Sequence, residues 1–132
     1  MTIAYWCVFA AALLPYATVA IAKRGSFDNS HPRDWEARLE GRRKRAHHAH
    51  LNGFEAFPFF AAMVILAHLL HAPQGVVDVV AILFVAARVV YVWCYIVDKA
   101  MWRSLAWGVG FACCVALFFI AAFARGPAPI IF

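Results

Sequence analysis

The sequence predicts an all-α integral membrane protein, a bundle of four helices that each cross the bilayer. Of its 132 residues, 65% are apolar and only 14% are charged, which is too hydrophobic for a soluble domain of this length. Four stretches also have enough apolar residues to cross a hydrocarbon core about 30 Å thick, which takes about 20 helical residues. We therefore expect one domain, residues 1–132, with approximate spans at 2–22, 51–70, 76–97 and 104–124.

The first span has a competing interpretation as a secretory signal peptide, because Ala17-Thr18-Val19-Ala20 loosely resembles a cleavage site. A signal peptide carries its positive charges ahead of the apolar region. Here no basic residue precedes the apolar run, whereas Lys23 and Arg24 follow it at once. The charge pattern therefore favours a retained membrane helix.

Basic residues are concentrated in the loop at residues 23–50. Eight of the twelve Lys and Arg residues lie between Lys23 and Arg45, and loops enriched in these residues stay on the cytoplasmic side of a membrane. We expect this loop to be cytoplasmic and both termini to be outside, in the periplasm. The net charge of +5 is then an orientation signal, so no nucleic-acid partner is expected.

The connections between the spans follow from turn-forming and charged residues. From about Asp34, mixed charges favour a water-exposed helix that leads into the second span. Residues 71–75 should form an outer turn and residues 98–103 an inner one. The fourth span should end at Arg125-Gly126-Pro127.

No metal site is expected. Adjacent histidines on a helix point about 100° apart, so the histidines at 47, 48 and 50 are better interpreted as interfacial residues at the start of the second span. The four cysteines lie within predicted spans and lack the spacing of a metal site, which favours buried apolar residues. They are Cys7, Cys94, Cys113 and Cys114.

Three ionisable residues lie within the predicted spans, where such groups need a partner or a function. They are Glu55 in the second span and Asp78 and Arg88 in the third. Glu55 lies ten residues after Arg45 and Arg88 ten residues before Asp98, so each is roughly 15 Å along its helix from the cytoplasmic charges. Glu55 and Arg88 could therefore form a structural ion pair.

Polar residues extend from this pair in two stripes. Steps of three and four place each stripe on one helical face. The stripe on the second span consists of Arg45, His48, Asn52 and Glu55, and the one on the third consists of Arg88, Tyr91 and Tyr95, extended by Asp98. Together they offer more variety than a structural pair requires, and they suit a small zwitterionic ligand.

Glutathione has this character, with two carboxylates, one ammonium group and a thiol. Arginine and lysine suit its carboxylates, Glu55 suits its ammonium group, and Asn52 and the tyrosines suit its peptide groups. A nearby guanidinium stabilises a thiolate and so lowers the pKa of the thiol. Arg103, at the start of the fourth span, is placed to do so.

These residues carry a resemblance to a known family. Over nearly its whole length the sequence resembles the MAPEG family, the membrane-associated proteins in eicosanoid and glutathione metabolism. The motifs are Asn52-x-x-Glu55-x-x-Pro58, Arg88-x-x-Tyr91-x-x-x-Tyr95, Arg103-Ser104 and Lys23-Arg24. Residues 27–33 are more similar to bacterial members than to the animal enzymes, so eicosanoid substrates are not carried over.

The resemblance implies a homotrimer of four-helix protomers in a bacterial inner membrane, with glutathione bound as a cosubstrate between subunits near the cytoplasmic face. It implies glutathione-binding roles for Asn52, Glu55, Tyr91 and Tyr95, a thiolate-stabilising role for Arg103 with Ser104 beside it, and a carboxylate contact for Arg24 or Lys23. Arg88 completes this set. The family often has arginine where this chain has His48, which replaces a fixed charge by one that titrates near neutral pH.

The expected function is that of a membrane-bound transferase or peroxidase that uses glutathione against lipophilic electrophiles or hydroperoxides. The alternative is a noncatalytic scaffold or accessory subunit with the same fold, since fold alone does not establish function. Asn52, Glu55, Tyr95 and Arg103 together favour catalysis, because a scaffold needs none of them. A small transporter is less favoured, since few polar residues lie in the outer half of the spans.

Overall fold

The structure, a computed structural model, describes residues 1–124 and is all-helical over that range. Its helices are α1 (Ile3–Ala22), α2 (Pro32–Ala37), α3 (Gly41–Leu69), α4 (Gln74–Ile96) and α5 (Ala100–Ala122). All except α2 are long and apolar enough to cross a membrane, which confirms the four predicted spans. The predicted end of the fourth span at Arg125-Gly126-Pro127 lies outside the described residues.

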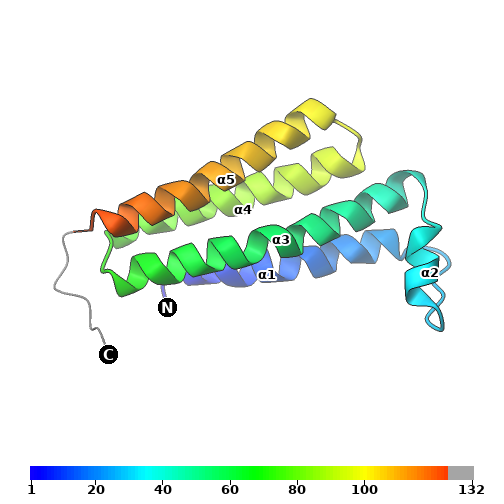
Figure 1. The fold of residues 1–132 in the computed structure, drawn as a ribbon, viewed down its shortest axis with the longest axis horizontal. Helices are drawn as coiled ribbons and strands as arrows, with labels where there is room; N and C mark the ends of the chain where they lie inside the picture. The colour runs from blue at the N-terminus through cyan, green and yellow to red at the C-terminus, as the bar shows by residue number, and fades with distance from the viewer. Residues whose placement is uncertain (125–132) are drawn as a thin grey trace.

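The four long helices form two pairs. Helix α1 packs mainly on α3, and α4 mainly on α5. Figure 1 shows the pairs close together where α3 joins α4 and diverging toward the other end, where α2 lies across the bundle. We call residues 23–45 and 97–103 the basic end, and residues 2–5, 67–78 and 117–124 the far end.

At the basic end, the polar approach to the second span is not one continuous helix, contrary to the expectation. Helix α2 stops at Ala37 and α3 begins at Gly41, which has a positive φ of 55°. Apolar contacts account for the break, because Trp35 and Leu39 are buried against Ala22. The chain therefore folds back on the bundle, and α3 then runs without interruption through 29 residues into its membrane span.

Both turns between membrane helices are closed by the same backbone motif. His71 and Asp98 have positive φ values of 55° and 63°, and the residue after each donates its N–H to a carbonyl five residues earlier. This is the Schellman arrangement, in which a left-handed residue satisfies the last carbonyls of a helix. Asp98 therefore lies beyond the end of α4 and does not extend the polar face of that helix, contrary to the prediction.

The core lies between the two helix pairs. Phe60 of α3 and Phe84 of α4 are almost wholly buried, and their rings stack with centroids 3.8 Å apart. Helices α1 and α3 approach closely at Gly53, where an added Cβ would lie 2.7 Å from Cγ of Pro15. Small residues allow such close backbone approach, which supplies van der Waals contact in a lipid environment.

Asp78 has a structural role at the far end. Its Oδ1 accepts hydrogen bonds from the backbone N–H of Ala4 and from Nε2 of Gln74, each 2.8 Å long. Ala4 belongs to the first turn of α1, where backbone N–H groups lack helical partners and favour a negative charge. The sequence identified Asp78 as an ionisable residue in need of a partner, and the start of α1 supplies it.

Candidate functional site

A short hydrogen-bonded chain links α3 and α4 midway along the bundle. One terminal nitrogen of Arg88 donates to Oδ1 of Asn52 at 2.8 Å, and Nδ2 of Asn52 donates to Oε2 of Glu55 at 3.0 Å. Among residues 1–124, the only ion pair within 4.0 Å joins His31 and Asp28. The direct ion pair that the sequence allowed for Glu55 and Arg88 does not form, because the Asn52 amide lies between them and bonds to both.

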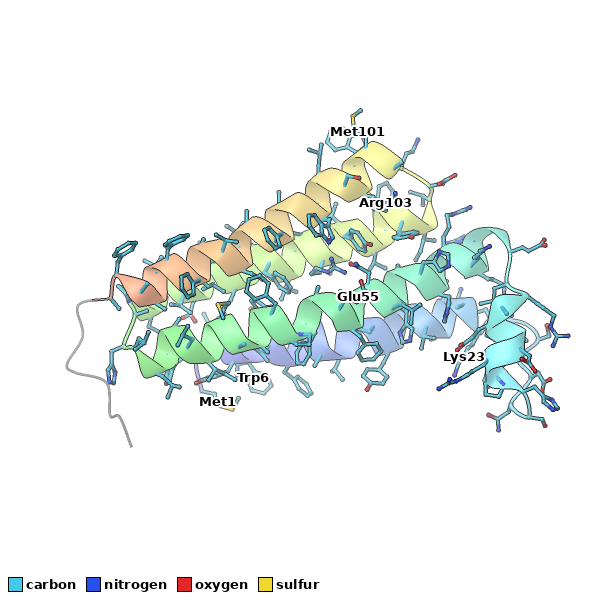
Figure 2. All side chains as sticks on the ribbon, in the orientation of Figure 1. Met1, Trp6, Lys23, Glu55, Met101 and Arg103 are labelled. Atoms are coloured by element: carbon cyan, nitrogen blue, oxygen red, sulfur yellow. The ribbon has the colours of Figure 1, made fainter. Side chains whose placement is uncertain are left out.

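Arg88 and Glu55 differ greatly in exposure. Only 4% of Arg88 is exposed, whereas Glu55 lies on the exposed side of α3. In Figure 2, Glu55 lies between α3 and the α4–α5 pair, in the middle of the bundle. The chain thus runs from a buried cation to an accessible carboxylate, with one amide oriented by both.

Aromatic rings continue the site toward the basic end. The guanidinium carbon of Arg88 lies 4.1 Å from the centroid of the Tyr91 ring, and the Tyr91 and Tyr95 rings are 5.6 Å apart. The Arg103 guanidinium lies 4.5 Å from the Tyr95 ring. These cation–π contacts hold two arginines from α4 and α5 against the two predicted tyrosines.

A polar pocket of about 260 Å³ lies beside these rings. It is lined by His48, Leu51, Asn52, Glu55, Tyr91 and Tyr95. Five of these six residues come from the two predicted polar stripes, and the His48 and Tyr95 rings are 6.3 Å apart across it. The structure therefore brings the stripes of α3 and α4 together.

A second, apolar cavity of about 300 Å³ shares Asn52 and Glu55 with the polar pocket. Its other lining residues are Ala56, Phe59, Phe84, Arg88, Trp107, Gly110, Phe111 and Cys114. Arg88 lines this cavity but not the polar pocket. The sequence alone does not assign the aromatic residues of α5 to this cavity, because the spacing of aromatics within one helix does not show what another helix contributes.

The remaining predicted site residues lie elsewhere in the protomer. Ser104 is exposed and lines neither cavity. Lys23 and Arg24 are exposed at the end of α1, where the Lys23 ammonium lies 4.3 Å from the Phe27 ring. Figure 2 places Lys23 beside α2, away from Glu55 and Arg103. Within one chain, Lys23, Arg24 and Ser104 are therefore not gathered with the other predicted site residues.

Two arginines of the basic end have structural roles that the sequence did not reveal. Nε of Arg43 donates to the carbonyl of Ala22 at 2.8 Å, and Nε of Arg45 donates to the carbonyl of Ile96 at 3.1 Å. Each acceptor is the last residue of a membrane helix, where carbonyls lack helical partners and a cation is favourable. These two arginines thus fasten the start of α3 to the ends of α1 and α4.

His50 is similarly occupied, because its Nδ1 lies 2.7 Å from the carbonyl oxygen of Pro15. A carbonyl only accepts hydrogen bonds, so Nδ1 carries the proton in this contact. Over residues 1–124, no group of three or more His, Cys, Asp or Glu side chains is arranged to hold a metal ion. The four cysteines are buried, as predicted, and none of the four forms a disulfide.

The fold and the site define an integral membrane protein with four helices long enough to span a membrane and a polar pocket at the level where the helix pairs diverge. A scan against models of protein families matches the MAPEG family over residues 3–123. The chain therefore belongs to the MAPEG family. Neither the curated proteins nor the solved structures contain a match to it.

Proposed function

We propose that this protein is a membrane-bound glutathione transferase or peroxidase that acts on lipophilic electrophiles or hydroperoxides. The observation that carries the proposal is the polar pocket, in which Asn52, Glu55 and Tyr95 meet beside Arg103. Membership of a family associated with glutathione metabolism supports the same conclusion.

In this proposal glutathione lies in the polar pocket. The accessible Glu55 carboxylate pairs with its ammonium group, while Asn52, Tyr91 and Tyr95 bond to its peptide and carboxyl groups. Arg88 orients Asn52 from behind through the 2.8 Å hydrogen bond. His48 lies at the pocket edge and contributes a positive charge only when it is protonated.

Lys23 and Arg24 would complete the site only from a neighbouring subunit, since they lie away from the pocket of their own chain. We therefore propose a homotrimer in which glutathione binds between protomers and Arg24, or Lys23, holds a carboxylate. Two negative charges on the ligand then meet fixed cations, which the polar pocket of one protomer does not provide.

Arg103 would stabilise the glutathione thiolate, with Ser104 following it at the start of α5. In conjugation, the sulfur forms a bond to the electrophilic carbon and the leaving group departs with its electron pair. In peroxide reduction, the sulfur attacks one peroxide oxygen and an alcohol departs. A second glutathione then converts the sulfenic acid to the disulfide and water.

We propose that the basic end faces the cytoplasm of a bacterium, with the protein in the inner membrane and both termini in the periplasm. The positive-inside rule supports this orientation, because ten of the twelve Lys and Arg residues lie at that end. Glutathione would then enter the polar pocket from the cytoplasm, and lipophilic substrates would enter from the membrane.

The proposal is tested by glutathione titration of the purified protein in lipid nanodiscs, followed by turnover with a chlorodinitroarene and with a lipid hydroperoxide. We expect saturable glutathione binding, and we expect Arg103→Ala to reduce turnover by about 100-fold or more, the range found when one donor to a developing anion is removed. Glutathione affinity should change much less, because the pocket itself is retained.

Arg42→Ala is the matched control, since Arg42 is an exposed arginine at the start of α3 and lines neither cavity. Ultraviolet absorbance of the bound thiolate should disappear in Arg103→Ala and persist in Arg42→Ala. Absence of glutathione binding at millimolar concentration would overturn the proposal. Binding without turnover of either substrate would instead support a noncatalytic scaffold or accessory subunit.

A further inference from the structure

Arg88 is a buried cation that contacts no carboxylate directly among residues 1–124, because the Asn52 amide separates it from Glu55. It is 4% exposed, and no carboxylate oxygen lies within 4.0 Å of its nitrogens. Its polar partners among the described residues are the neutral Asn52 amide and the face of the Tyr91 ring. Within a membrane span such a charge is costly unless an anion or a polar network offsets it.

The surroundings of Arg88 show where an anion could reach it. Arg88 lines the apolar cavity, together with aromatic residues of α3, α4 and α5. The Trp107 and Phe111 rings are stacked 8° from parallel, and Phe59 lies 6.0 Å from Phe111. Arg88 is therefore the cation in a wall that is otherwise mainly aromatic and aliphatic, apart from Asn52 and Glu55, which this cavity shares with the polar pocket.

The outer wall of this cavity is accessible from the lipid side. Trp107 is 46% exposed, Phe111 49% and Phe59 38%. The cavity volume of about 300 Å³ is at the lower end of the roughly 300 to 1,000 Å³ found for small-molecule sites. The space thus suits a small molecule that partitions into the membrane, with a flat body that stacks on aromatic rings.

We infer that the apolar cavity binds a small organic anion with a flat apolar body, its charged group at Arg88 and its body against Trp107 and Phe111. A carboxylate at Arg88 would supply the direct ion pair that Glu55, on the other side of the Asn52 amide, does not make. If glutathione occupies the polar pocket, which is the function proposed above, this anion is the acceptor substrate. Its charged end would then lie next to glutathione, because the two cavities share Asn52 and Glu55.

The test compares 2-naphthoate with 2-naphthamide, which share a flat body and differ in charge. Binding to the protein in nanodiscs of zwitterionic lipid is measured by equilibrium dialysis. We expect the ratio of naphthoate affinity to naphthamide affinity to be about tenfold or more higher in wild type than in Arg88→Gln. In Arg88→Gln the preference for the carboxylate should vanish. Arg88→Lys should retain part of it. Comparing variants in the same lipid removes the unequal partitioning of the two probes.

A second pair of variants tests the location without altering Arg88. Gly110 lines the cavity, and an added Cβ there would make ordinary contacts of 3.7 Å with Arg88 and Phe84. Gly108, two residues away, has no atom within 4 Å of an added Cβ and does not line the cavity. Gly110→Val should weaken naphthoate binding about tenfold, and Gly108→Val should leave it unchanged.

The outcomes separate this inference from the glutathione proposal. Equal probe preference in wild type and Arg88→Gln, or equal effects of Gly110→Val and Gly108→Val, would overturn the inference. Naphthoate binding with the expected pattern but no glutathione binding would overturn only the proposed function. Tighter binding of dodecanoate than naphthoate, with the same dependence on Arg88, would identify an acyl-chain site and overturn the flat-body assignment.

Discussion

The far end and the middle of the bundle use charged residues in different ways. At the far end, the Asp78 carboxylate accepts two hydrogen bonds of 2.8 Å and joins α4 to the start of α1. Midway along the bundle, the Arg88 side chain donates a hydrogen bond to a neutral amide and lines a cavity. Both residues are ionisable groups in membrane spans. Their hydrogen bonding supports a structural role for Asp78 and the ligand-binding role proposed for Arg88.

Packing follows the same division. The largest fully buried side chains, Phe60 and Phe84, stack between α3 and α4, whereas the polar pocket borders half-buried or exposed residues such as Asn52 and Glu55. Substitutions in the packed region should therefore act on stability, and substitutions around the polar pocket should act on ligand binding. The following predictions test this separation.

The largest stability effect is expected for Phe60→Ala. This change leaves a void beside Phe84 and should lower the free energy of unfolding by about 3 to 5 kcal/mol, as for other buried Phe→Ala changes. Unfolding in mixed micelles, followed by circular dichroism, measures it. Phe54→Ala on the same helix is the control, since Phe54 is 40% exposed. Equal losses for the two variants would contradict a packed core at this level.

Gly53→Ala should have the next largest effect. The added Cβ would lie 2.7 Å from Cγ of Pro15, so α1 and α3 must separate or shift, which costs about 1 to 3 kcal/mol for an overpacked site. Gly108→Ala provides the comparison, because nothing lies within 4 Å of its added Cβ and alanine favours the helix. An unfolding temperature of Gly53→Ala equal to that of wild type would contradict the close approach of α1 and α3 at this residue.

Asp78→Ala should destabilise the far end by about 1 kcal/mol, the usual effect of losing a side-chain partner for an N-terminal helix N–H. Amide hydrogen exchange at Ala4 should accelerate, while exchange near Tyr91 should not change. Glutathione affinity should also be unaffected, because Asp78 lines neither cavity. Altered glutathione binding would show that the far end and the polar pocket are not independent.

The smallest effect is expected for Arg45→Met, which removes the 3.1 Å hydrogen bond to the last residue of α4. A cation at a helix C-terminus contributes about 0.3 to 1 kcal/mol, and methionine retains much of the apolar length. Thermal unfolding should shift slightly, and hydrogen exchange should increase at the turn after Ile96. Unchanged exchange at that turn would argue against a capping role for Arg45.

Periodicity and charge predicted much of this molecule. Apolar length identified the four spans, and steps of three and four on α3 and α4 placed His48, Asn52 and Tyr95 around one pocket, because those steps fix a helical face whatever surrounds it. Family membership, expected from the same motifs, was confirmed by the match over residues 3–123. The roles assigned to individual site residues stay proposals.

Other features depend on contacts between helices, and the sequence pattern of a single helix does not reveal those contacts. Equal depth of Glu55 and Arg88 suggested a direct pair, but depth does not specify which side chain reaches across, and Asn52 occupies the space between them. The break at residues 38–40 depends on burial of Trp35 and Leu39 against Ala22, a contact distant in sequence. For the same reason, the apolar cavity could not be predicted from the aromatic residues of α5 alone.

The hydrogen bonds of Asn52 also connect the two cavities energetically. Its amide is planar, with the oxygen bonded to Arg88 and the nitrogen bonded to Glu55. A ligand that binds Glu55 and rotates this amide would weaken the hydrogen bond from Arg88 to the Asn52 oxygen. An anion that binds Arg88 would compete for the same guanidinium and leave the Asn52 amide free to reorient beside Glu55. Occupancy of one cavity would thus change affinity in the other, and linkage requires the two effects on affinity to be equal.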